Sequence, residues 1–158
     1  MPVENNKEKF NDRELTLVRT YNAPRELVYK AWIERDQLAQ WWAPKNFTNP
    51  VCEIDVRPGG KINITMRGPD GTDYPMGGEF QEVIENEKLV FTSTAYEDEN
   101  GDPLLKNLNT VTFKAKDGKT ELTLHVDVLI TSDKVKDAHS GMKQGWNESL
   151  DKLEEFLK

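Results

Sequence analysis

The sequence predicts an α+β fold in which a curved antiparallel sheet of about seven strands wraps around one long C-terminal helix. Seven segments alternate apolar and polar residues, and short turns join the last six of them. Two short helical patterns follow the first of these segments, and one long amphipathic stripe closes the chain. Short turns force antiparallel pairing, and alternation indicates that one face of the sheet is covered.

Residues 1–12 are polar and are predicted to form a flexible N-terminal lead. The remaining residues, 13–158, are predicted to form a single domain, because a chain of this length suits one hydrophobic core. The N-terminus also lacks the apolar stretch of a secretory signal peptide, and no run of residues is apolar and long enough to cross a membrane. We therefore expect a cytoplasmic protein.

The first segment of the domain is predicted to be a strand, followed by two short helices. Within residues 13–21, Leu15 and Leu17 stand two positions apart on one face. Pro24 then opens a helix, since proline is tolerated in a first helical turn. A second short helix is expected at residues 35–42.

The middle of the chain is predicted to be a series of strands. The clearest is a period-two run in which Ile62, Ile64 and Met66 share one face. An acidic, turn-rich loop is expected at residues 97–103. The predicted strands are 51–56, 61–66, 74–84, 89–95, 109–115 and 121–128.

The C-terminal residues 140–157 are predicted to form a helix with one apolar stripe that includes Met142, Trp146 and Leu150. This helix is the one long amphipathic element that can cover the sheet. Because a strongly curved sheet touches a straight helix unevenly, we expect a pocket between the two.

The charge pattern argues against nucleic acid and membrane surfaces as partners. The formal net charge is −7, and such a chain lacks the basic patch that phosphate backbones and anionic lipids attract. The single cysteine, Cys52, rules out a disulfide within the chain and a thiolate metal cluster. It is expected to be a small buried residue rather than a nucleophile.

No catalytic residue, metal site or cofactor is expected. His125 alternates with apolar neighbours and is predicted to face outward, and His139 precedes the last helix. The two histidines do not form a metal-binding motif. Glu53 and Asp55 share one phase of a predicted strand and are interpreted as a solvent-facing charged row. If that phase were reversed, these carboxylates would enter the pocket and supply acid–base chemistry.

Two adjacent tryptophans, Trp41 and Trp42, precede Pro44. Neighbouring helical residues point about 100° apart, so both indoles cannot face the same way. One is expected in the core and the other at the edge of the second helix or at the mouth of the pocket. The expected pocket lining is Trp42, Met66, Phe80, Phe91, Phe113, Met142 and Trp146.

Several segments resemble the START-like SRPBCC superfamily, which has the helix-grip fold, and within it the branch of homologues of the activator of the 90-kDa heat-shock protein ATPase. The resemblance runs from about Leu15 to Leu157 and implies the helix-grip fold with a cavity for an apolar or aromatic molecule. It rests on YNAPRELVYKAW (21–32), LAQWWAP (38–44), EIDVRPGGK (53–61), GPDG (68–71), GGEFQE (77–82), EKLVFT (87–92) and GWNESLDKL (145–153).

Three functions remain open at this point. The first is a cytoplasmic protein that binds a small apolar or aromatic molecule between the sheet and the C-terminal helix. The second, implied by the resemblance, is a chaperone-interaction module like the ATPase activators. The third is a cyclase, dehydratase or hydrolase that uses the same cavity. The sequence identifies neither the ligand nor the oligomeric state.

Overall fold

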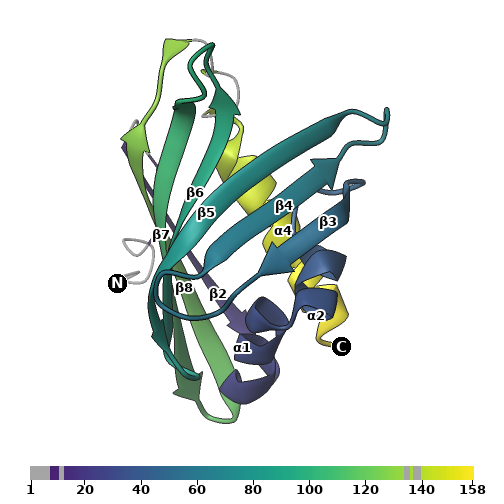
Figure 1. Ribbon diagram of the computed structural model, residues 1–158. Coiled ribbons are helices and arrows are strands. Elements are labelled where there is room, and N and C mark those ends of the chain that lie inside the picture. Colours follow the sequence, from purple (N-terminus) through teal and green to yellow (C-terminus); the bar gives the residue numbers. More distant parts are fainter. Residues whose placement is uncertain (1–7, 11–12, 134–135, 137–139) are drawn as a thin grey trace.

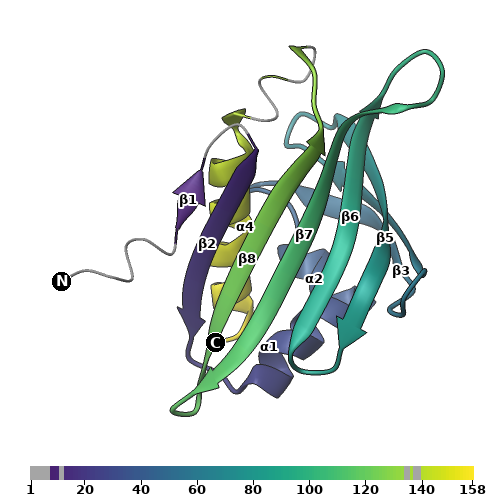
Figure 2. The same ribbon diagram turned by 90° about the vertical axis from the view of Figure 1, so that its left-hand side faces the viewer.

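The computed structural model describes residues 8–10, 13–133, 136 and 140–158. In this part of the chain an eight-stranded antiparallel sheet curves around the C-terminal helix, and the two short helices lie on the same concave side (Figures 1 and 2). The strand order is β1-β2-β8-β7-β6-β5-β4-β3. The predicted α+β helix-grip architecture is therefore confirmed.

The first elements follow the expected order. Strand β1 (Lys9–Phe10) pairs with β2 (Glu14–Tyr21) at the edge of the sheet. Helix α1 (Arg25–Ile33) begins directly after Pro24, and α2 (Arg35–Trp41) ends where the Trp42 amide donates to the Leu38 carbonyl oxygen. Most of the predicted flexible lead, residues 1–12, lies outside the described residues. Strand β1 belongs to the described part of this lead.

The remaining strands are β3 (Thr48–Ile54), β4 (Lys61–Arg67), β5 (Asp73–Ile84), β6 (Lys88–Glu97), β7 (Pro103–Lys116) and β8 (Lys119–Ile130), and helix α4 spans Met142–Phe156.

Two of the differences from the predicted strand bounds have a clear structural cause. Strand β3 ends at Ile54 because the chain then turns tightly, with the Asp55 amide donating to the carbonyl oxygen of Lys61. Strand β7 begins at Pro103, well before the predicted residue 109, because β6 and β8 pair with it on both sides. The pairing supplies hydrogen bonds there although the residues show no apolar alternation.

The core fills the concave side of the sheet. Alternate residues of β2 and β8 point into it, and Leu15, Leu122 and Leu124 are fully buried. The C-terminal helix adds Leu150 and Leu153, which are also fully buried. The outer face of the sheet carries no helix in the described residues (Figure 2).

No helix in the described residues has the length and apolar character needed to span a membrane.

Candidate functional site

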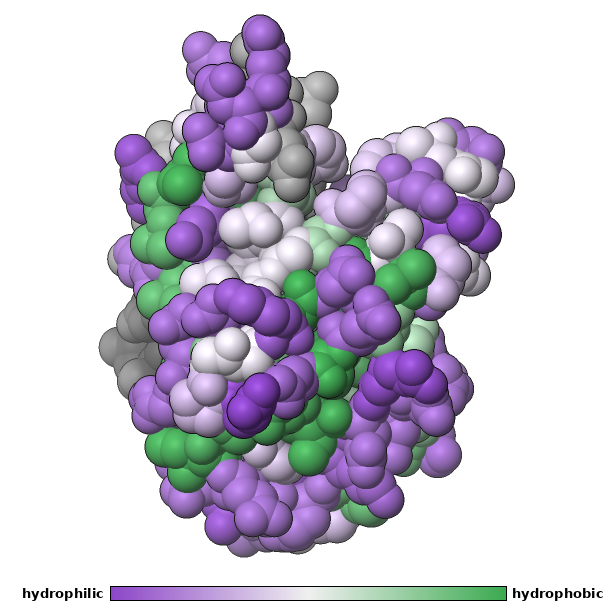
Figure 3. All heavy atoms as spheres, in the orientation of Figure 1, coloured by the Kyte–Doolittle hydropathy of each residue, from purple (hydrophilic) through white to green (hydrophobic). Residues whose placement is uncertain are grey.

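A pocket opens where two hairpins of the sheet separate. Pairing between β5 and β6 ends at Met76 and Ala95, whereas the β4–β5 hairpin continues to Asp73 and the β6–β7 hairpin to Glu97. The two hairpin ends lean apart in the ribbon (Figure 1), and the surface is hollowed between them (Figure 3). The sheet therefore leaves a gap that its own strands do not fill.

Helix α4 covers the core with its C-terminal half and the pocket with its N-terminal half. The C-terminal half is anchored by Leu150 and Leu153 and by the Tyr21 hydroxyl, which donates to the Leu150 carbonyl oxygen at 3.0 Å. Met142 and Trp146, nearer the N-terminal end, are only partly buried and line the pocket. Because α4 rests on β2 and α2 at one end, it stands off the splayed strands at the other.

The cavity measures about 420 Å³, which lies within the range of small-molecule sites. Its wall combines α4, the segment after α2, and the inner faces of β4 to β7. The lining residues are Trp42, Ala43, Pro44, Phe47, Met66, Tyr74, Met76, Ser93, Thr94, Ala95, Tyr96, Leu105, Asn107, Gly141, Met142, Gly145, Trp146 and Ser149.

The segment 42–47, which forms one side of the pocket, is held by three polar side chains of α4, of which Glu148 accepts from the Lys45 amide at 3.2 Å. The buried Ser149 hydroxyl donates to the Ala43 carbonyl oxygen at 2.9 Å. The Lys152 ammonium lies 3.1–3.4 Å from four carbonyl oxygens of this segment. Burial lowers the pKa of Lys152, and the Glu148 carboxylate acts in the opposite direction. These contacts fix the segment 42–47 to helix α4, which covers the pocket.

The four tryptophans of the chain form a single cluster beside the pocket. Trp41 is fully buried, and its indole N–H donates to the Ala31 carbonyl oxygen at 2.9 Å. Trp42 points instead toward the pocket and meets Trp146 edge to face, with ring centroids 5.2 Å apart. Of the adjacent indoles, one is therefore core and the other lies at the pocket.

Four of the seven residues expected in the lining are brought together around this cavity. They come from the end of α2, from β4 and from α4, which are far apart in the sequence. They are Trp42, Met66, Met142 and Trp146.

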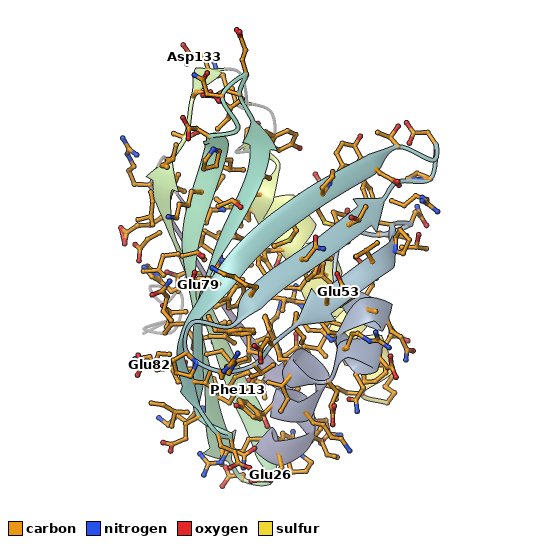
Figure 4. The ribbon with its side chains drawn as sticks, in the orientation of Figure 1. Glu26, Glu53, Glu79, Glu82, Phe113 and Asp133 are labelled. Carbon is orange, nitrogen blue, oxygen red and sulfur yellow. The ribbon has the colours of Figure 1, made fainter. Side chains whose placement is uncertain are left out.

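The other three lie deeper in the molecule. Phe80 and Phe91 line a separate void of about 20 Å³ together with Trp32 and Trp42, and a space of this size leaves no room for a ligand. Phe113 lines neither space and packs edge to face against Tyr29 and Trp32 (Figure 4). Core and pocket residues both point toward the inner face of the sheet. The alternation pattern alone therefore does not distinguish a pocket residue from a core residue.

Sequence reasoning missed two inward-facing asparagines of β7, of which Asn107 lines the pocket. Asn107 and Asn109 face inward on β7 and are only 8% and 0% exposed. Extending the period-two pattern of Val111 and Phe113 backward along the strand would have placed both asparagines on the inner face. The predicted start at residue 109 ended the pattern too early.

The described lining residues include no carboxylate, imidazole, amine, guanidinium or thiol. Their only ionisable groups are the phenols of Tyr74 and Tyr96, at the ends of the two hairpins. Burial raises the pKa of Tyr96, and the nearby Tyr74 adds to this effect. The raised pKa keeps the Tyr96 phenol neutral near pH 7.

The carboxylates weighed as acid–base groups lie away from the pocket. Glu53 is exposed and accepts a hydrogen bond from Asn63 at 3.0 Å (Figure 4). Asp55 pairs with Arg57 at 2.7 Å, also in solvent. Cys52 is buried, and burial raises the pKa of its thiol, which disfavours the nucleophilic thiolate.

A second group of polar residues lies on the outer face of the sheet. Ligand atoms of Glu14, His125 and Asp127 fall within 4.8 Å of one another, and Thr16 hydrogen-bonds the His125 ring at 2.8 Å. The outward phase of His125 was expected, but the trio was not, because it forms only when β2 pairs with β8. It lies on the opposite face from the pocket and supplies no group to it. His139 falls outside the described residues.

Comparison with known proteins places these features in a family. The model of the family described as "Activator of Hsp90 ATPase homolog 1-like protein" matches residues 22–158. No curated protein matches the chain.

Solved structures share the fold over nearly the whole chain. A Chromobacterium violaceum protein is 25% identical with a TM-score of 0.81, and the match covers 93% of this chain and 98% of that one. An Arthrobacter aurescens protein is 25% identical with a TM-score of 0.80, covering 94% and 89% respectively. A Mycobacterium smegmatis protein is 25% identical with a TM-score of 0.79, covering 96% and 94%.

Proposed function

The chain belongs to the family of Activator of Hsp90 ATPase homolog 1-like proteins, and from this premise we propose that it is a cytoplasmic protein that binds a small apolar or aromatic molecule in the pocket between sheet and α4. Family membership supports a ligand-binding or chaperone-related module in general. The choice of a small-molecule ligand rests on the pocket itself.

The observation that carries the proposal is the composition of the cavity wall. A space of about 420 Å³ is bounded mainly by indole, phenyl, thioether and aliphatic groups, with a few neutral polar atoms among them. Specific small-molecule sites have this composition, since apolar groups supply affinity and a few polar atoms fix orientation. Each Å² of apolar surface removed from water contributes about 25 cal/mol.

The wall also favours binding over catalysis. A hydrolase, dehydratase or cyclase moves protons, and the usual donors and acceptors are carboxylates, imidazoles, amines, phenols and thiols. Of these the described lining offers only the phenols of Tyr74 and Tyr96, at the ends of the two hairpins. Glu53 and Asp55 stand in solvent, so they do not supply the missing groups.

The proposal is tested by titrating the purified protein with aromatic and aliphatic compounds while reading intrinsic tryptophan fluorescence. All four indoles lie in the cluster beside the pocket, so an occupant should quench or shift their emission. A saturable response to one chemical class that requires a higher ligand concentration in a folded Trp146→Phe variant would support the proposal. No response from ligand-free, folded protein would contradict it.

The family description favours a chaperone-interaction role as the second candidate, since it names an activator of the Hsp90 ATPase. That role predicts a stable complex with the chaperone and a faster ATPase cycle when the protein is added. The same purified protein can be used in both assays. Absence of complex formation together with unchanged ATPase turnover would exclude this role.

A further inference from the structure

We propose that Glu14, His125 and Asp127 form a binding site for one divalent transition-metal ion on the outer face of the sheet. The site lies on the opposite face from the pocket, so this proposal goes beyond the proposed function and is tested independently of it. It depends on where strand pairing places the three ligand groups, on the hydrogen bond behind the imidazole and on the access of solvent.

Strand pairing places two carboxylates directly opposite each other. In the ladder between β2 and β8, Glu14 is the partner of Asp127, and Thr16 is the partner of His125. Because side chains two residues apart share one face of a strand, all four project from the same face of the sheet. Like charges directly opposite each other across a ladder are destabilising. A cation between the two carboxylates would replace that repulsion with attraction.

The core holds the backbone under these residues in place. Leu15, Leu124 and Val126 alternate with the polar residues on the two strands, point inward and are fully buried. Ligand groups on such packed strands keep their spacing better than groups on loops. The His125 side chain is 32% exposed, and no helix of the described residues covers this face (Figure 2). An ion can therefore reach the site from solvent.

The distances suit a single ion. The Nε2 atom of His125 lies 3.1 Å from an Asp127 carboxylate oxygen and 3.8 Å from a Glu14 carboxylate oxygen. All three ligand atoms fall within 4.8 Å of one another. Ligand atoms around a tetrahedral Zn²⁺ lie roughly 3.3–3.6 Å apart. Small side-chain rotations would bring the three groups to one ion, and water would fill its remaining position.

The second nitrogen of the imidazole has the partner that a metal ligand requires. The Nδ1 atom of His125 lies 2.8 Å from the Thr16 hydroxyl oxygen. A metal ion on Nε2 requires the ring proton on Nδ1, and the hydroxyl oxygen can accept a hydrogen bond from it. Thr16 is therefore a positioning residue, which orients the ring without touching the ion.

The ligand atoms indicate the class of ion. One imidazole nitrogen and two carboxylate oxygens suit Zn²⁺ and related divalent ions such as Co²⁺. Mg²⁺ prefers oxygen ligands and releases its water reluctantly, so we expect it to bind much more weakly. Because the three ligands come together only when β2 pairs with β8, the ion would bind the folded chain in preference to the unfolded one and stabilise it.

The experiment titrates the untagged chain with Zn²⁺ and separately with Mg²⁺ by isothermal titration calorimetry near neutral pH. We expect one Zn²⁺ ion per chain and weak or undetectable binding of Mg²⁺. Paramagnetic Co²⁺ then locates the site by NMR. It should broaden the amide signals of residues 14–16 and 125–127 before those of the pocket.

Three variants test the named residues. His125→Gln removes a ligand and should weaken Zn²⁺ binding by more than about tenfold, and Thr16→Val keeps all three ligands but should weaken it by roughly tenfold. The matched control is His139→Gln, which removes the other histidine of the chain and should leave the affinity unchanged. Circular dichroism checks that each variant is folded, and the Co²⁺ measurement on wild type tests the site if one is not.

The outcomes bear on separate parts of the proposal. Absence of Zn²⁺ binding to wild type, or binding that survives His125→Gln, would overturn the site. Equal affinities for Zn²⁺ and Mg²⁺ would overturn the assignment to a transition-metal ion. Unchanged affinity in Thr16→Val would overturn the positioning role of that hydroxyl. Binding of small molecules in the pocket is unaffected by any of these results.

Discussion

Trp42 and Trp146 meet edge to face beside the pocket, with their ring centroids 5.2 Å apart and their planes at 84°. Trp42 follows α2 and Trp146 belongs to α4, so this contact joins the segment after α2 to the C-terminal helix. Both side chains line the cavity. Edge-to-face aromatic pairs are stabilising beyond the area they bury, and this one also shapes the space available to a ligand.

We predict that Trp146→Phe weakens ligand binding by roughly three- to tenfold and changes the free energy of unfolding by less than about 1 kcal/mol. The indole is only partly buried, so the smaller ring removes pocket contacts more than core contacts. Affinity is measured by titration with the best ligand found, and stability by urea unfolding.

The matched control is Trp41→Phe. This indole is fully buried, lines neither cavity and donates to the Ala31 carbonyl oxygen. We expect a stability loss of about 1–3 kcal/mol with ligand affinity unchanged. Parallel losses of stability and affinity at both positions would mean that Trp146 is merely a core residue.

A second prediction concerns Lys152, which joins helix α4 to the segment 42–47 at the side of the pocket. Lys152→Met keeps most of the apolar stem but removes the donor to the carbonyl oxygens of Trp42, Ala43, Pro44 and Phe47. We expect a loss of about 1–2 kcal/mol in stability and faster amide exchange in the segment 42–47.

Lys143→Met provides the control for this change, because Lys143 is exposed on the same helix. Its removal should change the free energy of unfolding by less than about 0.5 kcal/mol. Amide exchange in the segment 42–47 should stay as in wild type. Similar effects from the two variants would show that charge loss on α4, rather than the contact with the wall, is responsible.

The architecture could be read from the sequence because it depends on periodicity. Strands such as β4 alternate cleanly, and the stripe on α4 repeats at helical spacing, so burial follows from pattern. The start of β7 was missed because Lys106 and Asn107 interrupt the alternation. That strand is held by pairing on both sides, which depends on residues elsewhere in the chain.

The pocket was harder to predict than the fold. Trp42 and Trp146 were identified because large aromatic residues on helices had to face the sheet somewhere. Phe80 and Phe91 share that inward phase, yet the splay of the hairpins begins beyond them, so they remain core. The point at which two hairpins separate depends on strand pairing across the sheet. It therefore cannot be predicted from the local sequence pattern.

The third prediction tests the close approach of β5 and β6 below the splay. A Cβ atom on Gly78 would collide with the backbone carbonyl of Thr92, whereas one on Gly77 would lie 3.4 Å from the Thr94 hydroxyl oxygen and 3.8 Å from the Ile62 carbonyl oxygen. We expect Gly78→Ala to cost about 2–3 kcal/mol.

Gly77→Ala, one residue away, should be neutral or slightly stabilising, since alanine reduces the freedom of the unfolded chain. Urea midpoints of the two variants provide the measurement. Equal midpoints would show that the sheet relaxes around Gly78 and that the approach of the strands there does not fix their geometry.

The last prediction concerns the alkaline limit of stability. Burial raises the pKa of Tyr21 well above its ordinary value of 10.0, and the protonated hydroxyl donates to the Leu150 carbonyl oxygen on α4. The unfolded chain therefore loses this proton first as the pH rises. The stability that Tyr21 contributes is fully present below about pH 10 and is lost as the pH rises toward the folded-state pKa.

Urea unfolding at about pH 8 and about pH 10.5 measures this effect. Between these two pH values the free energy of unfolding should fall steeply for wild type and less steeply for Tyr21→Phe. Near pH 8 the variant should be less stable by about 1 kcal/mol, because it lacks the hydrogen bond. Identical declines in the two proteins would show that the buried phenol does not limit stability at high pH.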